Sequence, residues 1–175
     1  MANRNWSSGY SRQDLEAAQE RHGFEFPADL FELLLERRPT ESLDWRTDHE
    51  ELERSLAWPL EGILFDIDEN DFWLNEWGDK PNSTEERHSI ARAAFNAAPT
   101  LIPVFSHRYI PEVPAQKGNP VFSVYQTDII YYGANLTHYF ENEFGSWTSK
   151  APKDYRTIPF WSDLALLNCT PPSES

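Results

Sequence analysis

The sequence predicts a single α+β domain with a mainly antiparallel central sheet flanked by helices. Residues 11–57 show helical spacing of apolar side chains, whereas most β-rich runs lie between residues 101 and 132. The segments do not alternate with the regular βαβ rhythm of a doubly wound sheet, which favours the α+β class. A chain of 175 residues, 39% of them apolar, has the size and composition to build one domain without a disulfide or metal staple.

Three helices are predicted before residue 58. The first begins after Ser11, where Asp14 three residues on makes an imperfect capping box, and ends near Gly23. The second covers residues 27–39, because a proline at its first turn precedes apolar residues at helical spacing, and two arginines and a second proline close it. The third covers residues 48–57.

The middle of the chain predicts a hairpin followed by a helix. Residues 62–67 have the composition of a strand, and residues 72–74 have that of its partner across the polar turn 68–71. An alanine-rich helix is expected from Ser83 to Ala97, since Ser83 and Glu86 have capping-box spacing.

The sheet is expected to be completed further along the chain. Residues 101–105 form a short apolar run typical of a buried strand, and a proline-rich loop is expected over residues 107–120. Residues 121–125 and 128–132 predict a second hairpin, and Gly133 offers the positive φ needed to turn the chain into the next helix.

The last predicted elements are a helix over residues 136–144, capped by Asn135, and a short helix near residues 160–167. We therefore predict one domain over residues 1–175, with a core at about 11–144 and a C-terminal extension at 145–175.

The charge is strongly negative and uneven. The net charge is −14, with 22 acidic and 10 basic side chains in residues 1–100 and 7 and 5 in residues 101–175. Phosphate binding depends on Lys and Arg, so nucleic acid is excluded as a direct ligand, and anionic membranes are repelled. A basic partner approaching the N-terminal half is favoured, although such an excess also serves solubility alone.

Cysteine content and hydropathy predict a cytoplasmic protein. Cys169 is the sole cysteine, which excludes a disulfide within the chain and a cysteine-rich metal site. The first residues lack the apolar run of a signal peptide, and no apolar stretch approaches the roughly 20 residues that a membrane span needs.

No motif for a metal, a cofactor or a nucleophile emerges. Residues 66–71 begin like a calcium loop, but Asp71 replaces the required glycine and Trp77 replaces the bidentate glutamate. The five histidines show no zinc-binding spacing. His107 follows a predicted strand, where a structural role is favoured over a place in a ligand-binding groove. Ser123 lies outside any nucleophile elbow, and Cys169 falls in an irregular tail.

An aromatic-lined ligand pocket is the remaining chemical alternative. Tyr125, Tyr131 and Tyr132 could line a groove for a small polar substrate, but aromatics in such β-rich runs usually pack in a core. The sequence therefore predicts no enzyme, no metal and no cofactor.

Residues 101–144, 26–39 and 58–78 together resemble the SUKH superfamily, which is named after the yeast Smi/Knr cell-wall-assembly regulators. Residues 101–144 (LIPVFSHRYIPEVPAQKGNPVFSVYQTDIIYYGANLTHYFENEF) resemble the C-terminal half of these domains. Residues 26–39 (FPADLFELLLERRP) are similar to the family's second-helix signature, and residues 58–78 to its first hairpin. The resemblance spans about residues 11–144 and is most specific over 118–133.

The resemblance implies an α+β binding domain without a shared catalytic constellation. Many bacterial members are immunity proteins that neutralise the toxic domain of a polymorphic toxin, commonly a nuclease or deaminase. We therefore predict a non-catalytic protein that occludes a basic toxin domain. Fungal members act as regulatory scaffolds, so an adaptor in signalling or cell-wall synthesis is the alternative. The oligomeric state stays open.

The predicted contact surface combines acidic groups, which steer a basic partner, with aromatic groups, which anchor it. Its members lie on the expected hairpin turn, just beyond it, and in the later proline-rich loop. They are Asp68, Glu69, Asp71, Glu76, Trp77, Asp79, Arg108 and Tyr109.

Overall fold

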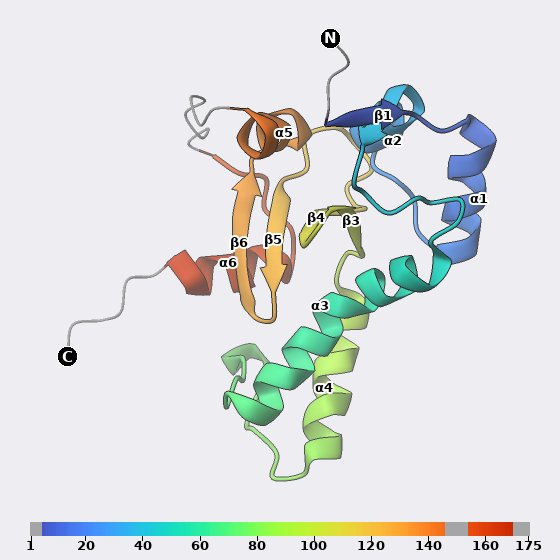
Figure 1. Cartoon of the computed structure of the whole chain (residues 1–175). Helices are drawn as coiled ribbons and strands as arrows, with labels where there is room; N and C mark the ends of the chain where they lie inside the picture. The colour runs from blue at the N-terminus through green and yellow to red at the C-terminus, as the bar shows by residue number, and fades with distance from the viewer. Residues whose placement is uncertain (1–4, 146–153, 170–175) are drawn as a thin grey trace.

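A four-stranded antiparallel sheet lies at the centre of the computed structural model, which describes residues 5–145 and 154–169 (Figure 1). Its strands lie side by side in chain order: β3 (Leu101–Phe105), β4 (Arg108–Pro111), β5 (Val121–Tyr125) and β6 (Asp128–Gly133). Two short strands form a separate antiparallel pair: β1 (Trp6–Ser8) and β2 (Arg37–Pro39). The predicted α+β class with an antiparallel sheet is confirmed.

The helices of the described residues surround this sheet (Figure 1). They are α1 (Arg12–His22), α2 (Ala28–Glu36), α3 (His49–Glu69), α4 (Thr84–Ala97), α5 (Leu136–Phe144) and α6 (Trp161–Cys169), with a 3₁₀ turn η1 (Asn75–Trp77) between α3 and α4. No helix in this part of the chain combines the length and the apolarity that crossing a bilayer requires.

The predicted caps fix several helix ends. Ser11 Oγ accepts from the Asp14 N–H at 3.1 Å, and Asp14 Oδ2 accepts from the Ser11 N–H at 3.0 Å, so α1 begins with a full capping box. Gly23 ends α1 with φ 71°, a conformation that glycine adopts without steric cost. The Asn135 side chain caps α5 by accepting from the His138 N–H at 2.9 Å.

Two hydrophobic clusters form the core, one on each face of the sheet. Side chains of neighbouring strand residues point to opposite faces. Accordingly, Ile102 and Ile110 belong to the first cluster, whereas Leu101 and Tyr109 belong to the second. Helices α1, α2 and α5 cover the first cluster, and α4, α6 and the C-terminal half of α3 cover the second.

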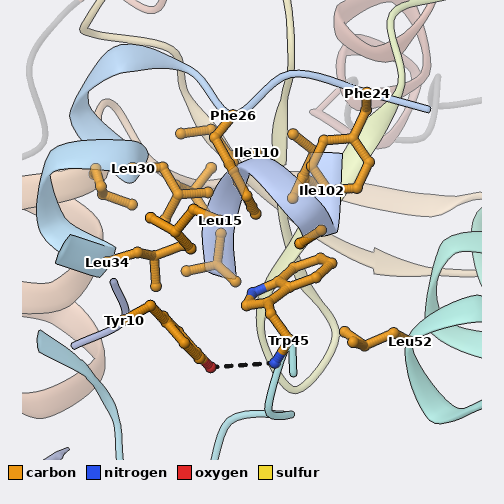
Figure 2. Packing of buried hydrophobic residues seen from close by; sticks show 14 of the residues in the cluster. Tyr10, Leu15, Phe24, Phe26, Leu30, Leu34, Trp45, Leu52, Ile102 and Ile110 are labelled. Carbon is orange, nitrogen blue, oxygen red and sulfur yellow. Dashed lines mark hydrogen bonds between the residues drawn. The ribbon is translucent and has the colours of Figure 1, made fainter. Parts of the chain in front are cut away.

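Aromatic edge-to-face contacts organise the first cluster (Figure 2). The Trp45 ring lies 5.5 Å from Phe24 and 5.1 Å from Phe26, centroid to centroid, in T-shaped geometry. Figure 2 also shows the Tyr10 hydroxyl accepting from the Trp45 N–H at 3.3 Å. This bond satisfies a backbone donor that the packing removes from water.

The predicted first hairpin is wrong, because α3 continues through it to Glu69. Ile63 and Ile67 are four residues apart, which is helical spacing, and both are buried in the second cluster. Pro59 indicated that the third helix ends before it, yet this proline lies inside α3. Burial of the apolar face outweighs the local β propensity, so Asp68 and Glu69 end a helix, and Phe72–Leu74 form no strand.

Three smaller expectations near the sheets are also corrected. The proline-rich loop contains β4, and the expected end of the second helix, Arg37–Pro39, is strand β2. Gly133 has no positive φ. Glycine is needed here because β6 passes close to α5: a Cβ at this position would lie 2.5 Å from Tyr139 Cβ.

The predicted C-terminal helix is confirmed as α6, and it belongs to the core. Trp161, Leu164 and Ala165 are buried in the second cluster. Cys169, expected in an irregular tail, is the last residue of this helix. The segment predicted as an extension therefore supplies part of the packing that holds the sheet.

Candidate protein-binding surface

Six of the eight predicted contact residues lie at the end of α3 and in the segment that follows it, at the bottom of the molecule in Figure 1. They are Asp68, Glu69, Asp71, Glu76, Trp77 and Asp79. Residues 61–92 hold nine carboxylates against three Lys or Arg side chains, so this end of the molecule carries negative charge.

Two of these carboxylates are engaged in ion pairs. Asp68 lies 3.0 Å from His88 Nε2 on α4, and Asp71 lies 2.5 Å from Lys80 Nζ. The hydrogen bond from Lys80 lowers the pKa of Asp71 below its ordinary value. The exposed side chains of Glu69, Glu76 and Asp79 have no ion-pair partner among the described residues, so they stay available to a basic partner.

Trp77 is half-buried within a small aromatic cluster. Its ring lies 6.0 Å from Phe72 and 5.0 Å from Trp73, both in edge-to-face geometry. The Trp73 indole N–H donates to the Gly78 carbonyl at 2.8 Å, which ties the cluster to the loop. Trp77 therefore stiffens the loop and exposes only part of its ring.

The prediction that Tyr109 lies on the contact surface is wrong. It lies on β4 with 1% of its surface exposed, and its hydroxyl donates to the Ser55 carbonyl at 2.8 Å. Burial raises the pKa of this phenol. The expectation of an exposed loop fails because the alternation of β4 turns Tyr109 into the second cluster.

Arg108 is likewise drawn into the fold. Its guanidinium lies 3.8 Å above the Tyr132 ring, donates to Ser123 Oγ at 2.8 Å and stands 3.5 Å from Glu143. Burial and this neighbouring cation lower the pKa of His107. A largely buried cation needs such partners to offset its lost hydration, so Arg108 has a structural role.

The three tyrosines of the chemical alternative do not converge. Tyr131 stacks on Tyr155 at 4.4 Å and donates to Ser162 Oγ at 2.5 Å, on the α6 side of the sheet. Tyr132 lies beneath Arg108 on the other face, and Tyr125 is exposed on β5. The alternation of side chains along β6 thus places Tyr131 and Tyr132 on opposite faces of the sheet.

The structure shows an exposed aromatic pair that was not predicted from the sequence. Trp58 and Phe65 are 41% and 49% exposed on α3, and their spacing of seven residues places them on one face. Exposed carboxylates share this face. We call the set the α3 stripe; its members are Trp58, Glu61, Phe65, Asp68 and Glu69.

The turn between β5 and β6 supports the α3 stripe. A Cβ on Gly62 would lie 2.7 Å from Gln126 Cα, so α3 touches this turn at backbone distance. The buried carboxylate of Asp66 accepts from the Thr127 N–H at 2.8 Å and from the Thr127 hydroxyl at 2.6 Å. The helix is therefore fixed to the sheet beside its exposed face.

Trp58 is held by the same hairpin. Its indole N–H donates to the Val124 carbonyl at 3.3 Å, and its ring lies 6.2 Å from that of Tyr125, which is 57% exposed. The hairpin thus holds two exposed aromatic rings in place, and Trp58 shares its face of α3 with Phe65. The seven-residue spacing was a signal for this face, but the predicted strand over residues 62–67 concealed it.

Comparison with known proteins adds no assignment: no family model, no curated protein and no solved structure matches this chain. Within residues 5–145 and 154–169, no group of three or more His, Cys, Asp or Glu side chains is arranged to hold a metal ion. What the surface offers chemically is apolar ring area flanked by carboxylates.

Proposed function

We propose that this chain is a non-catalytic protein-binding domain that acts in the cytoplasm as an immunity protein. It binds a basic toxin domain through the α3 stripe and occludes it. The observation that carries the proposal is a pair of exposed aromatic rings, Trp58 and Phe65, set among carboxylates on a helix fixed to the sheet. The resemblance of residues 101–144 to SUKH domains supports the same function.

The two kinds of side chain have different tasks in this proposal. Large aromatic rings at the centre of an interface supply most of the binding energy, and Trp and Tyr are enriched among such anchors. Lys and Arg side chains of the partner gain further energy over these rings through cation–π contacts. The carboxylates of Glu61 and Glu69 steer the partner and select its sign of charge.

The test uses a catalytically inactive form of the toxin domain encoded next to this chain's gene. We expect the two proteins to co-elute from a size-exclusion column. We also expect the association rate constant to fall about tenfold or more between low and physiological salt, because charge steers the encounter. Separate elution of the two proteins would remove the proposal.

Gene context separates this proposal from the scaffold alternative. A toxin gene directly beside this one is expected for an immunity protein. If no such gene is present, and affinity capture returns a signalling or cell-wall synthesis protein, the regulatory scaffold replaces it.

A further inference from the structure

A groove lies between α2 and α5, two helices at the opposite end of the molecule from the end of α3 in Figure 1. Its volume is about 660 Å³, which lies within the range of natural binding sites. We infer that this groove is a second binding site, which takes a basic amphipathic peptide segment of a partner protein. The inference is independent of the function proposed for the α3 stripe.

The floor of the groove is apolar and largely aromatic. The Trp6 ring of β1 lies 4.8 Å from Phe140 and 5.5 Å from Phe144, both on α5. Leu33 of α2 and Leu136 of α5 continue this floor. Such a surface between two helices fits the apolar side of an amphipathic segment, the helix-in-groove mode of peptide recognition.

The rim decides the charge of the occupant. Both helices contribute carboxylates to it: Asp29, Glu32 and Glu36 from α2, and Glu141 from α5. Glu36 and Glu141 are exposed and have no ion-pair partner among the described residues. A segment with Lys or Arg on its polar side would pair with these two groups, one on each wall.

The two cations of the rim do not favour an anionic ligand. Lys117 Nζ lies 2.5 Å from Glu32 Oε2, and the Arg37 guanidinium lies 4.4 Å above the Trp6 ring. Both cations are thus engaged, and an anion would meet an excess of carboxylates. This charge balance argues against an anionic membrane surface and favours a basic peptide.

The test needs two labelled helical peptides of twelve residues, each with leucine on one side and either lysine or glutamate on the other. Fluorescence anisotropy at physiological salt is expected to show at least tenfold tighter binding of the lysine peptide. Amide NMR signals of α2 and α5 are expected to shift on binding. Equal affinity for both peptides, or shifts confined to other elements, would overturn the inference.

Matched variants separate a groove from general attraction to an acidic protein. Glu36→Lys with Glu141→Lys is expected to weaken binding of the lysine peptide at least tenfold. Glu16→Lys with Glu20→Lys makes the same charge change on the exposed side of α1 and is expected to weaken it less than threefold. Equal losses in the two double variants would contradict the inference.

A third variant tests the shape of the site without touching its charge. Thr137 is exposed on the lining of the groove, so Thr137→Trp would fill part of the cavity. We expect this variant to keep the wild-type circular dichroism spectrum and to bind the peptide at least fivefold more weakly. Unchanged affinity in the folded variant would place the peptide elsewhere. No toxin enters any of these measurements, so a failure here leaves the proposed function standing.

Discussion

Replacing Trp161 with alanine is expected to lower the free energy of unfolding by about 4 kcal/mol, the cost of removing a large aromatic side chain from a core. Trp161 is 0% exposed, and its ring lies 5.8 Å from Phe95 and 4.9 Å from Phe160. Its indole N–H donates to the Pro99 carbonyl at 2.7 Å. The substitution therefore leaves a cavity and removes the donor of a partly buried hydrogen bond.

Urea denaturation followed by circular dichroism measures this loss. Trp58→Ala removes the same atoms from a half-exposed site, and we expect it to cost only about 1 kcal/mol. Similar losses for the two tryptophans would mean that α6 does not pack into the second cluster.

Replacing Asp66 with asparagine is expected to lower the free energy of unfolding by about 2–3 kcal/mol, although the two side chains have the same shape. Asp66 Oδ2 accepts from the Thr127 N–H and hydroxyl, and Oδ1 accepts from Asn70 Nδ2 at 2.6 Å. An asparagine has only one acceptor oxygen, so its NH₂ group would face a donor in either orientation. A buried polar group would then lack a partner.

Asp68→Asn is the matched control two residues away. Asp68 is more exposed and pairs with His88, so its replacement is expected to change stability by about 0.5 kcal/mol or less. Chemical denaturation of both variants gives the comparison. Hydrogen exchange of the β5–β6 turn is expected to speed up in Asp66→Asn alone; equal exchange in both would refute the role of Asp66 as the link between α3 and the sheet.

Local signals predicted the fold best where they act within a few residues. The Ser11 and Asp14 capping box, the Asn135 cap and the hairpin of β5 and β6 depend on short-range hydrogen bonds and turn chemistry. All three appear where they were predicted, and the capping box is complete where an imperfect one was expected. The course of α3 could not be obtained in this way. Residues 62–67 have β propensity, and only their burial beneath the sheet selects the helix.

The candidate surface was predictable in its charge and not in its shape. The acidic side chains from Asp68 to Asp79 are exposed or tied into surface ion pairs, because carboxylates at an element end seldom enter a core. The placement of Tyr109 failed, since its face of β4 depends on the register of the sheet. The pairing of Trp58 with Tyr125 joins residues 67 apart in the chain, and no local pattern indicates it.

The affinity of the proposed partner, a toxin domain encoded beside this chain's gene, for the Phe65→Ala variant tests the role of the α3 stripe most directly. The Phe65 side chain is about half exposed, so its loss is expected to leave the unfolding midpoint nearly unchanged. Isothermal titration calorimetry should show a dissociation constant about 30-fold higher or more, equivalent to about 2 kcal/mol, as for an interface anchor. An affinity equal to that of the wild-type chain would contradict the proposed binding surface.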